Sequence, residues 1–517
     1  MSHPKRWQVK TMQMSRDDNK NSVLALAAGN KSPDVFEAVM SGIENDVTPQ
    51  ELETILTQRG FKGNSLLATA ALSGEKASFE AVLEAVRTRL TPNQVKTMQM
   101  SCDDDKDSVL ALAARNNSPD VFGAVMSGIE NDVTPQELEI LLTQRGFQGR
   151  SLLATAALQG NKASFEAVLG AVRTRLTPDQ VQTMQMSYDD NKDSVLILAA
   201  RNKSPDVFGA VMSGIENDVT PQELETLLTQ PGFSGQSLLA VAALNGEKAA
   251  FEAVLEAVRT RLTPDQLEIL LTQPGFSGQS LLATAARFGN KASFEAVLDA
   301  VRTRLTPDQV QTMQMSYDDN KDSVLILAAR NKSPDVFGAV MSGIENDVTP
   351  QELETLLTQP GFSGQSLLAV AALNGEKAAF EAVLEAVRTR LTPDQVKTMQ
   401  MSCDDDKNSV LVFAVINESP DVFEAVMSGM ENDVTPQELE TLLTQRTSKG
   451  VSLLATAAQF GNKASFEAVL DAVRTTLTPD QLETLLTQRG SEGQSLLATA
   501  AVDGEKASFE AVLEAVR

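Results

Sequence analysis

The chain repeats a 43-residue pattern twelve times, starting at Pro4 and continuing to its last residue. One stretch, Leu176–Arg261, recurs letter for letter as Leu305–Arg390, three repeats further along. A period of this length is typical of elongated arrays in which each unit contacts mainly its neighbours. The repetition therefore predicts one continuous solenoid spanning residues 1–517, and it favours binding along an extended surface.

The repeats occur in two versions that have the same length and the same hydrophobic pattern. Numbered 1 to 12 in chain order, they start at residues 4, 47, 90, 133, 176, 219, 262, 305, 348, 391, 434 and 477. The A version, as in 176–218, forms repeats 1, 3, 5, 8 and 10, and the B version, as in 219–261, forms the other seven. Because length and pattern are shared, both versions should share one fold.

Each repeat is predicted to contain three short helices, of which the first opens with Thr-Pro. In repeat 6, Thr220 is a good N-cap, Pro221 suits the first helical position, and Glu223 can return a hydrogen bond to the cap. Pro231 and Gly232 then end this helix.

The second and third helices are predicted from their apolar residues. The second, Ser237–Ala243, is apolar nearly all round and should lie between neighbours in the stack. The third presents Phe251, Val254, Leu255 and Val258 on one face. No segment of useful length alternates with a period of two, so we expect no strands.

These two helices resemble the ankyrin repeat. The run Gly235–Gly246, GQSLLAVAALNG, is similar to that family's G-x-T-P-L-H-x-A-A-x-x-G motif. The period is 43 residues instead of 33, Leu238 and Ala240 replace the family's Pro and His, and a helix replaces its hairpin. The resemblance implies an all-α, right-handed α-solenoid of twelve ankyrin-like three-helix repeats. It also implies protein recognition without catalytic residues, and a role as a bacterial effector acting in a host cell.

Net charge and composition restrict the class of partner and the cellular compartment that we expect. The net charge of −25 is spread along the chain, which argues against nucleic acid as a partner and permits a basic protein. No apolar run is long enough for a membrane span, and the start does not read as a secretory signal peptide. The two cysteines, in one column of distant repeats, fit a reducing compartment. We expect a cytoplasmic protein, or one exported without a classical signal peptide into a host cell.

The sequence contains no residue set that predicts catalysis. The single histidine, His3, precedes the first repeat, and no nucleophile–base set, phosphate-binding loop or Cys/His metal spacing is present. We therefore expect no enzyme activity, no cofactor and no metal centre.

When the repeats are aligned, two positions vary among otherwise similar repeats, and their residues are our candidate partner-binding residues. We call each set of equivalent residues a column. Variation marks positions that the fold does not dictate, so these are either interface anchors or sites of sequence drift. The A column comprises Arg16, Cys102, Tyr188, Tyr317 and Cys403. The B column follows the second helix and contributes Phe288 and Phe460, as partner contacts or as local packing.

Each A repeat also has an acidic cluster between its first two helices, such as Asp189-Asp190. It is either a cation site or ladder for a basic partner, or a solvated loop whose residues cap the second helix. A calcium loop of the EF-hand type would need a glycine, whereas here Lys192 lies inside the cluster.

The leading hypothesis is a non-enzymatic protein-binding scaffold. The alternatives are a calcium-dependent binding module and a structural protein that self-associates end to end. End-to-end association is suggested by Phe509, Val512 and Leu513, an apolar face on the third helix of repeat 12.

Overall fold

The computed structural model describes residues 12, 15–460, 462–489, 493–502 and 506–517. Within these ranges the secondary structure consists of 35 α-helices, five one-turn 3-10 helices and seven isolated β-bridges, without a longer strand. The expected all-α repeat array is therefore confirmed. The chain divides into an N-terminal body, Met1–Ala242 with Glu252–Gln266, and a C-terminal body, Ala243–Phe251 with Leu267–Arg517. Repeats 1–6 supply most of the first body and repeats 7–12 most of the second.

The predicted three helices are present in each of repeats 2–12, and the second and third helices are described in repeat 1. The first helices are α4 (Pro49–Thr57), α7 (Pro92–Met100), α10 (Pro135–Thr143), α13 (Pro178–Gln185), α16 (Pro221–Thr229), α19 (Pro264–Thr272), α22 (Pro307–Gln314), α25 (Pro350–Thr358), α28 (Pro393–Met401), α31 (Pro436–Thr444) and α34 (Pro479–Thr487).

The second helices are α2 (Val23–Ala28), α5 (Leu66–Ser73), α8 (Val109–Arg115), α11 (Leu152–Gln159), α14 (Val195–Arg201), α17 (Leu238–Leu244), α20 (Leu281–Phe288), α23 (Val324–Arg330), α26 (Leu367–Asn374), α29 (Val410–Ile416), α32 (Leu453–Phe460) and α35 (Leu496–Val502). The third helices are α3 (Pro33–Glu44), α6 (Lys76–Arg89), α9 (Pro119–Glu130), α12 (Lys162–Arg175), α15 (Pro205–Asp218), α18 (Lys248–Arg261), α21 (Lys291–Arg304), α24 (Pro334–Asp347), α27 (Lys377–Arg390), α30 (Pro420–Asp433), α33 (Lys463–Thr476) and α36 (Lys506–Val516).

The Thr-Pro motif starts the first helix as predicted. In α16 the Thr220 side chain accepts a hydrogen bond from the Glu223 backbone, the Glu223 side chain accepts one from the Thr220 backbone, and Pro221 occupies the first turn. Two otherwise unsatisfied backbone donors are thereby bonded by residues three positions apart. The same local motif recurs in every repeat whose first helix is described.

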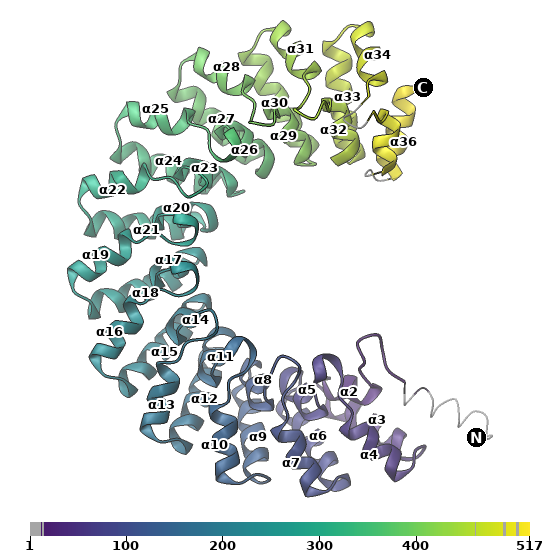
Figure 1. Ribbon diagram of the computed structural model, residues 1–517, viewed down its shortest axis with the longest axis vertical. Helices are drawn as coiled ribbons and strands as arrows, with labels where there is room; N and C mark the ends of the chain where they lie inside the picture. Colours follow the sequence, from purple (N-terminus) through teal and green to yellow (C-terminus); the bar gives the residue numbers. More distant parts are fainter. Residues whose placement is uncertain (1–11, 13–14, 461, 490–492, 503–505) are drawn as a thin grey trace, which may run out of the picture. The chain divides into compact units, whose positions relative to one another are not determined.

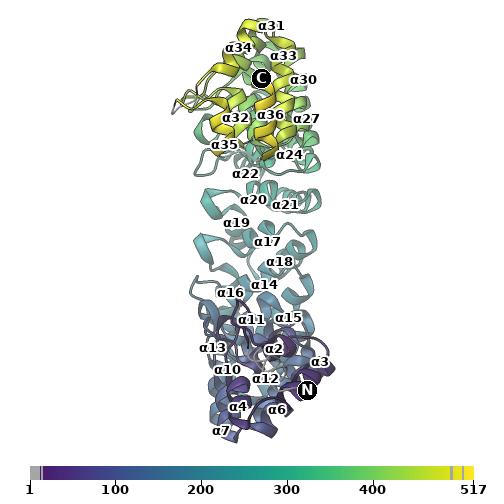
Figure 2. The ribbon, with the colours of Figure 1, turned by 90° about the vertical axis from the view of Figure 1, so that its right-hand side faces the viewer.

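Within each body, like helices stack on like helices. The second helices pack along one row, for example α8 on α11 and α23 on α26, and the third helices along another, for example α9 on α12 and α24 on α27. The first helices lie against the row of third helices (Figure 1). Figure 2 shows the same elements from the side.

One phenylalanine per repeat fills the core between these rows. From Phe36 to Phe466 the third-helix phenylalanine recurs every 43 residues, and each side chain is at most 2% exposed. Burying such a ring removes roughly 150–250 Å² of apolar surface from water. This regular burial is what the sequence pattern of the third helix predicts.

Polar side chains also connect successive repeats. The side chain of Asn202, the residue directly after α14, donates to the backbone oxygens of Ala157 (3.1 Å) and Gly160 (2.8 Å) in the previous repeat. The Arg173 guanidinium of α12 bonds the Asp218 carboxylate (2.9 Å) of α15.

Among the described helices, none combines the length and the apolar character needed to cross a bilayer.

Candidate functional site

Two kinds of loop join the first helix to the second and lie along one edge of each body. We call the A-version loops, which begin at the variable column, Asp loops; they are residues 16–22, 102–108, 188–194, 317–323 and 403–409. We call five B-version loops Phe loops; they are residues 60–63, 146–149, 232–235, 275–278 and 361–364. Each Phe loop contains a one-turn 3-10 helix: η1 (Phe61–Gly63), η2 (Phe147–Gly149), η3 (Phe233–Gly235), η4 (Phe276–Gly278) and η5 (Phe362–Gly364).

The acidic residues of an Asp loop hold the loop together. The buried Asp189 carboxylate accepts from the backbone nitrogens of Asn191 (2.9 Å) and Asp193 (3.0 Å), and Lys192 adopts a left-handed conformation with φ 66°. The cap of α14 is Ser194, whose side chain accepts from the backbone of Ile197. The expectation that the acidic residues cap the second helix is therefore wrong, because a serine directly before the helix takes that position.

The Phe loop of repeat 6 depends on an aspartate from the preceding Asp loop. The buried Asp193 carboxylate accepts from the Phe233 backbone nitrogen (2.9 Å) and pairs with Arg201 (2.9 Å), and burial raises the pKa of Asp193. A Cβ atom on Gly232 would lie 2.3 Å from Asp193 Oδ1, so only glycine leaves room for this carboxylate. Gly235 then closes the loop with φ 77°.

The Phe loops turn their rings toward solvent. The exposed fractions are 49% for Phe61, 41% for Phe147, 48% for Phe233, 45% for Phe276 and 50% for Phe362. The residue after each ring is non-glycine and left-handed, with φ between 52° and 55°; these residues are Lys62, Gln148, Ser234, Ser277 and Ser363. Exposed aromatic surface and left-handed backbone both cost free energy, and strain of this kind is concentrated at functional sites.

Successive loops are hydrogen-bonded to one another. In the N-terminal body, Phe61 N donates to the Asn21 side chain (2.8 Å), and Asp104 N donates to the Lys62 backbone oxygen (2.8 Å). The same two bonds recur from Phe147 N to the Asp107 carboxylate and from Asp190 N to Gln148 O. The loops therefore form a fixed row instead of independent flexible tips.

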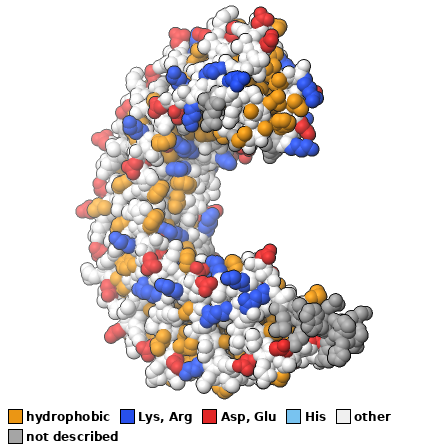
Figure 3. Space-filling view, turned by 45° about the vertical axis from the view of Figure 1, so that its right-hand side comes forward, with side chains coloured by type: hydrophobic (Ala, Val, Ile, Leu, Met, Phe, Trp, Pro, Cys, Tyr) orange, Lys and Arg blue, Asp and Glu red, His pale blue; other side chains and the backbone are white. Residues whose placement is uncertain are grey.

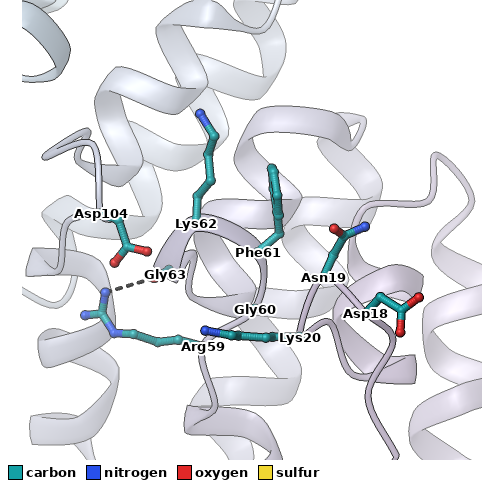
Figure 4. A pocket seen from close by; sticks show the side chains of 9 residues that line it. All are labelled: Asp18, Asn19, Lys20, Arg59, Gly60, Phe61, Lys62, Gly63 and Asp104. Atoms are coloured by element: carbon teal, nitrogen blue, oxygen red, sulfur yellow. Dashed lines mark hydrogen bonds between the residues drawn. The ribbon is translucent and has the colours of Figure 1, made fainter. Parts of the chain in front are cut away.

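Phe61 and Phe233 each line an open pocket between an Asp loop and a Phe loop. Figure 4 shows a pocket of about 480 Å³ that is lined by the Asp loop of repeat 1, the Phe loop of repeat 2 and Asp104 of repeat 3. Phe61 and Lys62 extend in one direction from the Phe loop, whereas the Lys20 side chain runs toward Arg59 and the Asp18 carboxylate points away from the ring. The equivalent pocket of repeats 5 and 6, about 630 Å³, is lined by Asp190, Asn191, Lys192, Gln230, Pro231, Gly232, Phe233, Ser234 and Gly235.

The A column lies at the start of the Asp loops, within the same row. Tyr188 and Tyr317 are half-buried, and their hydroxyl groups donate hydrogen bonds to the side chains of Gln230 (2.7 Å) and Gln359 (2.6 Å). Each of these glutamines is followed by a proline that directly precedes a Phe loop. Burial raises the pKa of both phenols. Tyr188 also lines an open pocket of about 520 Å³ with Arg145 and helix α13.

The other members of the A column have different neighbours. Cys102 and Cys403 are half-buried and accept from the Gln144 and Gln445 side chains at 2.9 and 3.2 Å, where an arginine follows the glutamine. Arg16 is exposed. The variation in this column thus follows the sequence of the adjoining loop: Tyr faces Gln-Pro, and Cys faces Gln-Arg.

The B column lies elsewhere. Phe288 and Phe460 end helices α20 and α32, at the turn into the third helix, and are 42% and 48% exposed. The Arg287 guanidinium lies over the Phe288 ring, 4.8 Å from its centre. The second helix separates this turn from the loop row, so the structure does not bring the two predicted columns together.

Sequence reasoning missed the Phe-loop rings, although a signal was present. Phe occupies this loop position in five B repeats and is replaced by Ser448 and Ser491 in the other two, with Ser491 outside the described residues. Variation of the kind that marks the A and B columns therefore marks this position as well.

The described residues contain no group of three or more His, Cys, Asp or Glu side chains that could hold a metal ion. Basic and acidic side chains are interspersed on the face shown in Figure 3, instead of being gathered by sign.

The sequence matches no protein-family model and no curated protein. Solved structures to which the chain is similar include the ankyrin repeat domain of Bcl-3, with 15% identity, a TM-score of 0.31 and coverage of 54% of this chain and 99% of that one. The human ASB11 ankyrin repeat domain has 15% identity, a TM-score of 0.33 and coverage of 54% and 96%. A chain from the Bd0816 predatory endopeptidase of Bdellovibrio bacteriovorus in complex with immunity protein Bd3460 has 16% identity, a TM-score of 0.30 and coverage of 45% and 96%. Two of these three are ankyrin repeat domains, the family that the helix motif resembles.

Proposed function

We propose that this chain is a non-enzymatic protein-binding scaffold that uses the row of loops on each of its two bodies, the Phe loops together with the A column, to hold a protein partner. The observation that carries the proposal is the set of five half-exposed phenylalanine rings on left-handed loops. The ring itself is not needed to end the first helix, because α31 ends at Thr444 with Ser448 at the same loop position.

The mechanism is repeated display of weak contacts. Each half-exposed ring leaves on the order of 100 Å² of apolar surface in water, and covering it contributes roughly 2 kcal/mol. Because the loops are bonded to one another, little loop entropy is lost on binding. Several such contacts made at once add through effective concentration.

Capture from a eukaryotic lysate tests the proposal when three forms of the full-length protein are compared. The first is unchanged, the second carries F61S, F147S, F233S, F276S and F362S, and the third carries I140T and I269T. Ile140 and Ile269 are 58% and 62% exposed on first helices, where other B repeats carry threonine, so the third form removes exposed apolar surface from another face.

We expect a partner that the unchanged protein and the Ile variant capture equally and that the Phe variant loses. A partner retained by the Phe variant would remove the Phe loops from the proposal. A fourth form, with Arg16, Tyr188 and Tyr317 changed to Ala, asks separately whether the A column contributes. Quantitative mass spectrometry of the captured proteins provides the comparison.

The more specific part of the proposal is that the scaffold acts as a bacterial effector in a host cell, and this part rests on the family resemblance alone. It predicts that the Phe-dependent partner is found in eukaryotic lysate and is absent from a bacterial one. Capture of the same Phe-dependent partner class from bacterial lysate would argue for a role inside the bacterium.

Self-association is a second candidate function, favoured by the exposure of core-type residues. Leu26 and Val35 in repeat 1 are 55% and 40% exposed, whereas their counterparts Leu112 and Val121 in repeat 3 are 1% and 0% exposed. Sedimentation velocity between 1 and 100 μM, roughly the range in which weak contacts become visible, would show a rising mass that L26S abolishes. A constant monomeric mass would remove this candidate.

A further inference from the structure

We infer that the Phe-loop row of the N-terminal body binds an extended polypeptide segment whose apolar side chains recur about every six residues. This inference rests on the proposed function and names the class of partner that the same loops would hold. Three observations on Phe61, Phe147 and Phe233 carry it: the rings recur at a regular interval, hydrogen bonds fix their loops, and the surface between the rings is polar.

The three rings recur at a constant interval. They occupy the same loop position in repeats 2, 4 and 6, so each ring is offset from the next by two repeats. Packed helices lie 8–10 Å apart, which places neighbouring rings about 16–20 Å apart. An extended chain rises about 3.3 Å per residue, so this distance corresponds to about six residues.

The interval is held by hydrogen bonds that run from loop to loop. Phe61 N bonds Asn21, Lys62 O bonds Asp104 N, Phe147 N bonds Asp107, Gln148 O bonds Asp190 N, and Phe233 N bonds Asp193, all at 2.8 or 2.9 Å. Six consecutive loops, from residues 16–22 to residues 232–235, are thereby linked without a break. A ligand with matching spacing would meet sites that are already in place, and a ligand with another spacing would engage one ring at a time.

The surface between the rings is polar, which favours a linear segment over a globular partner. A standard interface covers about 800 Å² on each side around a continuous apolar centre. Here each ring is separated from the next by an Asp loop with an exposed carboxylate and an exposed ammonium group, Asp104 with Lys106 and Asp190 with Lys192. Charge complementarity therefore places polar or charged residues midway between the apolar ones, about three residues from each.

Selection from a phage library of random 20-residue peptides on the full-length protein tests this inference. The apolar residues of the selected peptides should recur at intervals of five to seven residues. A synthetic peptide of the selected sequence should bind about tenfold more weakly after each single change of F61S, F147S or F233S, because each ring is an anchor. Fluorescence anisotropy of the labelled peptide provides the affinities.

Two matched controls sharpen the result. I140T should leave peptide affinity unchanged, because Ile140 lies on helix α10 and is not part of the loop row. Inserting three residues between two anchors of the peptide should weaken binding about tenfold, because the anchor on one side of the insertion can then no longer engage its ring together with the others.

Three results would overturn the inference: selected peptides without a common spacing, peptides with the i, i+3, i+4, i+7 pattern of an amphipathic helix, or binding that survives F61S, F147S and F233S together. A protein captured in a Phe-dependent way by the scaffold test, alongside any of these results, would leave the proposed function standing and remove only the extended partner. Loss of Phe dependence in both experiments would remove both.

Discussion

At the scale of single residues, the loops show why a pattern of glycines, aspartates and phenylalanines recurs. Gly232 is present because the Asp193 carboxylate occupies the space that a Cβ would need. That carboxylate comes from the previous repeat and bonds the Phe233 backbone across 40 residues of sequence. From the sequence alone, Phe233 belongs to a helix-ending segment, because no local rule reveals that its backbone is bonded elsewhere and its ring is left in water.

Changing Gly232 to Ala tests this contact. The added Cβ, 2.3 Å from Asp193 Oδ1, should displace the carboxylate and leave the Phe233 N–H without its acceptor, at a cost of about 1–3 kcal/mol. Hydrogen exchange at the Phe233 amide should accelerate, and the N-terminal body should unfold at lower urea concentration. In the control G209A the new Cβ meets nothing within 4 Å, on helix α15, so stability should rise by about 0.5–1 kcal/mol. Unchanged exchange at Phe233 in G232A would refute the role of Asp193.

At the scale of elements, the first helices are joined by a ladder of polar pairs. The cap residue Gln180 of α13 donates to Glu139 of α10 (2.5 Å), and Gln182 donates to Glu223 of α16 (2.7 Å). The sequence predicts each helix and its cap correctly, because caps and helix periodicity are local. It does not predict that the capping glutamine also bonds the preceding helix, because that contact depends on how successive repeats stack.

The ladder gives a pH-dependent prediction. Lys96 bonds Glu137 (2.5 Å), and this bond, together with those from Thr134, lowers the pKa of Glu137 from 4.5 to about 2. A lowered carboxyl pKa contributes stability that is present above pH 4.5 and is lost as the pH falls toward 2. In K96Q the pKa of Glu137 should rise yet stay below 4.5, as for Glu223, which has Gln182 as its partner.

Carbon-13 NMR titration of labelled glutamate side chains measures this shift. Glu438, which Lys397 holds at a pKa of about 2 in repeat 11, is the internal control and should not change in K96Q. If Glu137 titrates at the same pH with and without Lys96, the lysine is not the main cause of the low pKa.

At the scale of the whole molecule, the question is how far the repeats depend on one another. Within each body the second and third helices contact their neighbours in the adjacent repeats, which is the condition for nearly one-dimensional stability. The buried phenylalanines at 43-residue intervals were predictable from the pattern of the third helix. Continuity of one solenoid over residues 1–517 stays a prediction, because it depends on how the repeats on either side of residue 266 join.

Changing Phe122 to Ala should unfold the chain in part instead of as a whole. Phe122 is 1% exposed in helix α9, so the change should cost about 3–5 kcal/mol, and in a nearly one-dimensional array that loss is confined to nearby repeats. Hydrogen-exchange mass spectrometry should show lost protection in repeats 2–4 and unchanged protection in repeats 9–11. F337A, the counterpart in repeat 8, should spare repeats 2–4 and affect repeats 7–9. Equal loss of protection in all repeats, from either change, would mean that the chain unfolds as one cooperative unit and that local stacking does not set its stability.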